Sequence, residues 1–192
     1  GDGASQFRFS IGENGTGKLG YGDSSHSLGG NSTLSTSTWY HAVITRSSGA
    51  GYTFYLNGIF DGNTAPGSPP NTNSRSAYIG ARESNLGGLT SYFNGKIDEV
   101  RFYHRSLSAD EVSQLYRLTS PTGVDTGLKG YWSFNGKDIS GTSAYDRSGA
   151  GNTGTLTNGP TVTPGKIGQA LSFDGNNDYV DVGDMASIEG QG

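Results

Sequence analysis

Carboxylates in the second half of the chain are the side chains whose spacing could support chemistry. In the stretch 97–103, Asp98 alternates with Val100 and Phe102, so a continuous strand places its carboxylate on their core-facing side. Burying a carboxylate without a partner is energetically expensive, so it needs a cation or several hydrogen-bond donors. Two interpretations follow. Either Asp98 caps loop amides or pairs with Lys or Arg at a strand end, or it is a calcium ligand at the rim of the fold.

The loop 146–152 could complete such a calcium site. Asp146 and Asn152 supply side-chain oxygens, and the glycines between them let backbone carbonyls turn inward. Such a loop suits a hard cation that takes about six to eight oxygen ligands, although the spacing matches no EF-hand loop. We predict calcium as a cofactor, with Asp98 and Asp146 as the first ligands and Asn152 and Asp174 as further ones.

An acidic run surrounds the stretch 179–182 and contains Asp174, Asp178, Asp181 and Asp184. Strand alternation places Asp181 with Tyr179, on the side opposite Val180 and Val182. A solvated sheet face is the favoured interpretation of this run, and a second ion site is the alternative.

The patterns that catalysis would need are absent from the sequence. A retaining glycosidase uses two carboxylates about 5–5.5 Å apart. Asp98 and Glu99 point to opposite faces of a strand, and Asp110 and Glu111 lie at a helix start. There is no E-x-D pattern, no G-x-S-x-G elbow and no Cys, and the three histidines are scattered. The sequence therefore predicts that the chain is not an enzyme.

Composition and charge restrict the class of protein further. The 192 residues include 33 Gly, 11 Tyr and 8 Phe, a composition typical of many short strands joined by tight turns. The net charge of −4, with no Lys/Arg cluster, predicts no nucleic-acid partner. Because no apolar run approaches the ~20 residues that cross a bilayer, we expect no membrane insertion.

Alternating hydrophobic stretches predict roughly eleven to thirteen short strands. These strands include 6–11, 18–21, 39–45, 52–56, 59–60, 77–80, 96–103, 130–134, 153–156, 170–173 and 179–182. Asn57-Gly58 between two of them predicts a type I′ hairpin turn.

One short helix is expected after residue 107. Ser108 and Glu111 have the spacing of a capping box, and Leu107 and Val112 that of a hydrophobic staple. The segment 119–127, which contains Pro and Gly and has no periodicity, is predicted to be a linker.

Several of these segments resemble a known family. The stretch 96–112 (KIDEVRFYHRSLSADEV) resembles the closing strand and helix of the laminin-G-like jelly-roll repeats of bacterial surface proteins. The stretches 38–43 (TWYHAV) and 55–58 (YLNG) are similar to that family's central strands.

The second half of the chain is similar to the opening segment of the same family. The matching stretches are 130–134 (GYWSF), 146–152 (DRSGAGN) and 165–175 (GKIGQALSFDG). The resemblance implies an all-β, antiparallel β-sandwich of the concanavalin-like jelly-roll type with one short helix. Related jelly-roll families often bind a structural calcium through a carboxylate on the closing strand, which agrees with the expectation for Asp98.

The aromatic residues bear on carbohydrate binding. The resemblance implies that Trp39 and Trp132 pack in the core. Tyr21, Tyr92 and Tyr145 lie near loops and are the candidates for exposed rings that stack on sugars.

The halves of the family repeat occur in rotated order. Residues 1–118 resemble the closing half, 119–127 form the linker, and 128–192 resemble the opening half. Either the chain is a piece of a tandem array cut in mid-repeat at both ends, or it is a circular permutant whose halves pack as one sandwich. In both cases we expect that a pair of strands that the family places between the two halves has no counterpart within residues 1–192.

Three functions are compatible with these features. The favoured one is an extracellular or cell-surface binding and adhesion module that recognises carbohydrate or protein through the rim loops 22–37, 61–76 and 82–92. The alternative is a structural repeat unit that assembles with neighbouring copies into an array or filament. A glycoside hydrolase would require a carboxylate pair that only folding brings together.

Overall fold

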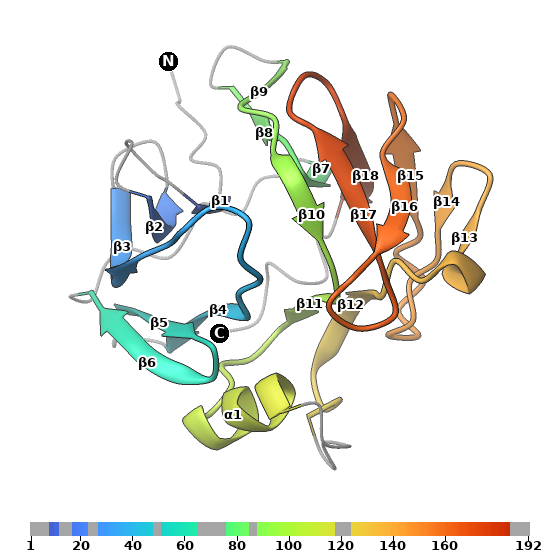
Figure 1. Ribbon diagram of the computed structural model, residues 1–192. Helices are drawn as coiled ribbons and strands as arrows, with labels where there is room; N and C mark the ends of the chain where they lie inside the picture. The colour runs from blue at the N-terminus through green and yellow to red at the C-terminus, as the bar shows by residue number, and fades with distance from the viewer. Residues whose placement is uncertain are drawn as a thin grey trace, which may run out of the picture. The chain divides into compact units, whose positions relative to one another are not determined.

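Antiparallel strands account for most of the structure. The computed structural model describes residues 8–11, 17–22, 27–47, 51–64, 76–84, 88–117 and 124–184. It divides into two units, of which unit 1 draws on residues 1–71 and 105–126, and unit 2 on residues 72–104 and 127–191. The predicted fold class, all-β and antiparallel with one α-helix among the described residues, is confirmed (Figure 1).

Unit 1 consists of two three-stranded sheets and the helix. The first sheet has the order β1-β2-β3 and the second the order β4-β5-β6. Their bounds are β1 (Arg8–Ile11), β2 (Lys18–Gly22), β3 (Ser27–Thr33), β4 (Ala42–Ser47), β5 (Gly51–Leu56) and β6 (Ile59–Asn63). Leu19 and Tyr21 from β2 pack with Tyr52 and Phe54 from β5, so alternate positions of the two sheets form one buried cluster.

The Asn57-Gly58 pair forms the predicted hairpin turn between β5 and β6. Both residues have positive φ angles, 52° and 77°, and Leu56 pairs with Ile59 across the turn. Two positive φ angles are the signature of a type I′ turn, whose twist matches that of the strands.

Helix α1 (Ala109–Arg117) begins at the predicted capping box. The Glu111 N–H donates to Ser108 Oγ (3.3 Å), and the Ser108 N–H donates to Glu111 Oε2 (2.8 Å). Leu107 and Val112 are both buried, as the predicted hydrophobic staple requires.

Unit 2 holds the remaining strands. Its largest sheet has the order β13-β14-β15-β18-β7, a second has the order β10-β17-β16, and two further sheets are the pairs β11-β12 and β8-β9. The bounds are β7 (Ser76–Ile79), β8 (Arg82–Glu83), β9 (Leu89–Thr90), β10 (Asn94–Ile97), β11 (Val100–Tyr103), β12 (Leu128–Trp132), the 3₁₀ helix η2 (Gly136–Asp138), β13 (Ile139–Ser140), β14 (Ser143–Ala144), β15 (Gly154–Thr157), β16 (Thr161–Pro164), β17 (Gln169–Asp174) and β18 (Tyr179–Asp184).

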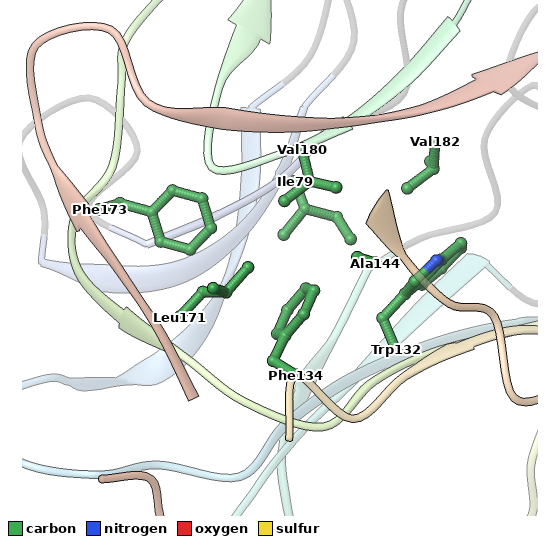
Figure 2. Packing of buried hydrophobic residues seen from close by; sticks show 8 residues of the cluster. All are labelled: Ile79, Trp132, Phe134, Ala144, Leu171, Phe173, Val180 and Val182. Carbon is green, nitrogen blue, oxygen red and sulfur yellow. The ribbon is translucent and has the colours of Figure 1, made fainter. Parts of the chain in front are cut away.

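The two larger sheets of unit 2 form a β-sandwich around a common core. The side chains of the five-stranded sheet and those of β17 and β12 point toward one another in Figure 2. At Gly80, just after β7, a Cβ atom would lie 2.6 Å from the Phe173 ring, so only glycine fits at this contact. The core residues drawn are Ile79, Trp132, Phe134, Ala144, Leu171, Phe173, Val180 and Val182.

Strands from distant parts of the chain pair within this sandwich. β10 pairs with β17, β11 with β12, and β7 with β18, so green segments lie beside yellow to red ones in Figure 1. Each pair joins the predicted closing half, 1–118, to the predicted opening half, 128–192. The assignment of these halves to a rotated family repeat stays a prediction.

Three predicted segments differ from the structure. The stretch 96–103 is not one strand, because Glu99 has a φ of 55° and separates β10 from β11. The predicted rim loop 22–37 contains β3, which pairs with β2, and the loop 82–92 contains the short hairpin β8-β9. Most of the loop 61–76 lies outside the described residues, although its start belongs to β6.

Candidate functional site

The outer face of the five-stranded sheet gathers aromatic and hydroxyl side chains. Along β18, Val180 and Val182 are buried in the core, so Tyr179 and Asp181 lie on the opposite face, as predicted for the acidic run. The registers align Asp181 with Tyr78 on β7 and with Thr155 on β15. Carboxylate, phenol and hydroxyl are therefore neighbours in one row across three strands.

A second row of the same face adds another aromatic ring. Tyr179 pairs with Thr157 on β15, and its ring meets that of Tyr78 edge to face, with centroids 5.7 Å apart and planes at 81°. Such a pair holds both rings in fixed orientations. No sequence pattern links these two tyrosines, because β7 and β18 lie far apart along the chain and only the sheet register brings them together.

The phenol of Tyr78 stays protonated over a wide pH range. Burial raises its pKa above the ordinary value, and the charges of Asp181 and Glu83 raise it further, whereas a hydrogen bond with Ser76 opposes the shift. A protonated phenol can both donate and accept a hydrogen bond.

Asp181 can accept hydrogen bonds beyond the one that it accepts within its own strand. Its Oδ1 accepts a hydrogen bond from the Gly183 N–H (2.8 Å). Among the described residues, the carboxylate accepts no other hydrogen bond. Its Oδ2 can therefore accept a hydrogen bond from a bound ligand.

Asp98 accepts hydrogen bonds from loop amides, as the first of its two interpretations describes. Its Oδ2 accepts hydrogen bonds from the N–H groups of Lys166 and Ile167, both 2.9 Å. The break at Glu99 ends the strict alternation with Val100, so the prediction of a continuous strand through Asp98 is wrong. The residue is half-buried, and burial raises its pKa despite these hydrogen bonds.

Asp146 organises its own loop. Its Oδ1 accepts from the N–H groups of Tyr131 and Ser148, and its Oδ2 from the Ser148 hydroxyl and the Asn152 N–H, at 2.8–2.9 Å. Partial burial pushes its pKa upward, but these hydrogen bonds outweigh burial and hold the pKa below its ordinary value. Four donors occupy the lone pairs that a cation would use.

The other two predicted ligands also make local contacts. The Asn152 side-chain amide donates to the Lys129 carbonyl (2.7 Å). Asp174 accepts from the backbone and side chain of Asn176, contacts that lower its pKa.

Of the four predicted calcium ligands, the structure brings Asp146 and Asn152 together, because the Asn152 N–H donates to Asp146, but it does not group the three predicted acids Asp98, Asp146 and Asp174 as metal ligands. Among the described residues no group of three or more His, Cys, Asp or Glu is placed to hold a metal ion. Asp98 alone of the four keeps a buried side-chain oxygen, Oδ1, without a hydrogen-bond partner in the described part of the chain. The set as a whole does not fit a shared calcium site, and calcium binding stays a prediction that rests on Asp98.

The aromatic predictions have mixed outcomes. Trp132 is fully buried, which confirms its core position, but Trp39 is 37% exposed, so the core prediction for it is wrong. Tyr21 was expected to be exposed and is 1% exposed, because it stacks on Tyr52 with ring centroids 3.8 Å apart. Tyr145 is exposed as predicted, and the Tyr92 hydroxyl donates to the Leu89 carbonyl.

A cluster that the sequence did not reveal is formed by Glu99, the residue before β11, with side chains of β11 and β12. Glu99 Oε2 accepts from Arg101 Nη2 (2.6 Å) and from the Tyr131 hydroxyl (2.8 Å), while the Arg101 guanidinium lies 4.1 Å from the Tyr131 ring centroid. Burial raises the pKa of Tyr131 to about 12. Because the three groups satisfy one another, this cluster stabilises the strand pair rather than presenting free groups to a ligand.

A buried acid also has a structural role. Asp138 accepts a 2.6 Å hydrogen bond from the Ser133 hydroxyl and forms an ion pair with Arg147 at 3.4 Å. Neither contact includes a histidine. Ser133 and Asp138 therefore lack the base that activates a nucleophilic serine.

Comparison with known proteins identifies the family. A laminin-G family model, that of the concanavalin A-like lectin/glucanases superfamily, matches residues 1–113. A search of curated proteins found no match. No helix in the described ranges is long and apolar enough to cross a membrane.

A solved structure shares the fold. It is the 1.50 Å crystal structure of a protein from Bacteroides ovatus ATCC 8483 that is proposed to bind carbohydrate. The two are 19% identical with a TM-score of 0.59, over 93% of this chain and 46% of the other, so this chain spans about half the length of that protein. With the family match extending over more than half of its residues, the chain belongs to the concanavalin A-like lectin/glucanases superfamily.

Proposed function

We propose that this chain is a carbohydrate-binding module and that the outer face of the five-stranded sheet in unit 2 is its binding surface. One observation carries the proposal: the edge-to-face pair of Tyr78 and Tyr179 lies directly beside Asp181 on a face of Thr and Ser hydroxyls. For brevity, the surface made by Tyr78, Thr155, Thr157, Tyr179 and Asp181 is called the tyrosine face.

The tyrosine face has the chemistry that sugar recognition needs. A pyranose ring presents C–H groups, which pack on aromatic rings, and hydroxyls, which need oriented donors and acceptors. The two tyrosines supply the apolar contact, and Asp181 supplies a charged acceptor, which makes stronger hydrogen bonds than a neutral one.

The comparisons support the same function. The superfamily to which the chain belongs is described by its lectins and glucanases, and the Bacteroides ovatus protein of the same fold is proposed to bind carbohydrate. A module of this kind meets its polysaccharides outside the cell, so we place it in an extracellular or cell-surface protein. Adhesion to a glycan-bearing surface is the role that such binding would serve.

The proposal does not include catalysis. The acids Asp98, Asp138 and Asp146 each hold local structure through hydrogen bonds. On the tyrosine face we assign Asp181 the role of a hydrogen-bond acceptor for sugar hydroxyls, and not that of a catalytic acid.

The test is an affinity measurement on the intact chain. A glycan array identifies a ligand, and isothermal titration then compares the native chain with Tyr179→Ala, which we expect to bind at least about tenfold more weakly. Tyr116→Ala is the matched control, because Tyr116 is a 44% exposed tyrosine on α1 in unit 1 and should leave the affinity unchanged. Absence of any glycan ligand, or equal loss in both variants, would overturn the proposal.

Self-association is a second candidate function, and β1 carries it. In the order β1-β2-β3 this strand lies at the sheet edge, and Phe9 and Ile11 on it are 48% and 50% exposed. An edge strand with exposed apolar side chains is a template for another strand, here that of a second copy. Light scattering should show an oligomer that Phe9→Lys dissociates, and a monomer at all concentrations would rule this function out.

A further inference from the structure

The sheet that carries the tyrosine face is acidic. Its five strands, β13, β14, β15, β18 and β7, contain two charged residues, Asp181 and Asp184, and neither Lys nor Arg. The next strand along the chain, β8, contains Arg82 and Glu83, whose formal charges cancel, and the Glu83 charge acts on the Tyr78 phenol.

Asp181 is at the centre of this charge distribution. It lies on β18, with β15 on one side and β7 on the other, so its cross-strand neighbours are Thr155 and Tyr78. Neighbouring strands are about 4.8 Å apart, so the row from Thr155 to Tyr78 spans about 10 Å with the carboxylate in its middle. A ligand lying across the row therefore cannot avoid Asp181.

The sign of the charge discriminates between classes of glycan. A sulfate or uronate group needs Arg or Lys as a partner, and a desolvated anion beside a carboxylate is repelled instead. Sugar hydroxyls, in contrast, donate to a carboxylate, and vicinal hydroxyls can donate to both of its acceptor sites.

We propose that the tyrosine face selects neutral polysaccharides and excludes sulfated and uronic-acid polysaccharides, with Asp181 as the residue that sets this specificity. The inference rests on the proposed function, because it presupposes that the face binds carbohydrate. It adds the class of ligand and the physical reason for the choice.

Affinity gel electrophoresis of the intact chain tests the selection. Gels contain either neutral polymers (laminarin, galactomannan and xyloglucan) or anionic polymers (polygalacturonate and heparin). We expect at least one neutral polymer to retard the native chain, Tyr179→Ala to abolish that retardation, and neither anionic polymer to retard the chain.

Two variants test the role of Asp181. Asp181→Asn keeps an oxygen for the Gly183 N–H but removes the charge, and should weaken binding of the neutral polymer about tenfold. Thr155→Lys replaces an exposed residue next to Asp181, so it should fold normally and should gain retardation by polygalacturonate.

The outcomes separate the two proposals. If an anionic polymer retards the native chain and Tyr179→Ala abolishes this effect, the tyrosine face binds carbohydrate but the inference about charge is wrong. If neutral binding survives in Asp181→Asn at full strength, Asp181 does not set the specificity. Retardation by none of the five polymers overturns the proposed function and the inference with it.

Discussion

The two carboxylate oxygens of Asp98 have environments with opposite effects on its pKa. Oδ2 accepts two backbone N–H groups, which favours the charged form, whereas Oδ1 is buried without a partner among the described residues, which favours the neutral form. Burial is the larger effect, so the pKa of Asp98 is raised. A cation at Oδ1 would relieve this cost, and this is the remaining physical basis for calcium.

A calcium site at Asp98 predicts a calcium-dependent melting temperature. A ligand that binds only the native state raises stability, so Tm should be higher in calcium than in excess EDTA, and Asp98→Asn should remove the difference. Scanning calorimetry in both buffers measures it. Identical Tm values for the native chain would leave Asp98 as an acceptor of loop amides alone.

At the scale of the element, the Glu111 carboxylate makes several of the polar contacts at the start of helix α1. Besides the capping box, Glu111 forms a bidentate pair with Arg105, with Oε1–Nη2 and Oε2–Nη1 distances of 2.6 and 2.9 Å. The hydrogen bonds from Arg105, then that from Ser108, lower the pKa of Glu111 from 4.5 to about 2.

The lowered pKa predicts a pH-dependent contribution to stability. Because the folded-state pKa lies below the unfolded one, the contribution is fully present above pH 4.5 and is lost as pH falls toward 2. Glu111→Gln should cost about 1 kcal/mol at pH 7, or about 2–4 °C in Tm, and nothing near pH 2. Asp110→Asn, in the same helix turn, is the control for surface charge. An equal loss from Glu111→Gln at both pH values would contradict the assignment.

The β5-β6 turn depends on glycine for two separate reasons. Gly58 has a φ of 77°, and a Cβ there would lie 3.0 Å from two atoms of Tyr116. Gly58→Ala should destabilise the chain by about 1–3 kcal/mol in urea unfolding. Gly17→Ala, with a φ of 65° but ordinary contacts, reports the backbone strain alone and should cost less. Equal losses would show that Tyr116 moves aside freely.

At the scale of the whole molecule, unit 2 is built from two stretches that the segment 105–126 separates along the chain. Trp132 on β12 is 0% exposed and meets Phe102 on β11 edge to face, with centroids 6.1 Å apart. The β-sandwich of unit 2 therefore needs strands from both sides of that segment.

This arrangement predicts complementation of fragments. A fragment 119–192 should show the red-shifted emission of a solvated Trp132, and adding fragment 1–118 with Trp39→Phe should shift the emission to the blue at equal stoichiometry. The reason is that the second fragment supplies β7, β10 and β11. Blue-shifted emission from fragment 119–192 alone would show that its strands form a core without them.

The sequence by itself determined the features that a few neighbouring residues control. The hairpin at Asn57-Gly58 follows from positive φ angles, and the start of α1 follows from hydrogen bonds between residues three apart. Alternation placed Asp181 opposite Val180 and Val182 correctly because a strand's side chains alternate whatever it pairs with. The fold class was likewise predictable from many such strands and turns.

Only the tertiary structure decided which side chains are covered and which meet. Tyr21 is buried and Trp39 exposed because burial depends on the facing sheet, which alternation does not specify. The break at Glu99 depends on a backbone conformation that residues 96–103 do not reveal. The tyrosine face could not be predicted either, since Tyr78, Asp181 and Thr155 become neighbours only through the registers of three strands distant in sequence. Registers of that kind are set by packing across the whole core, and not by the residues of any one strand.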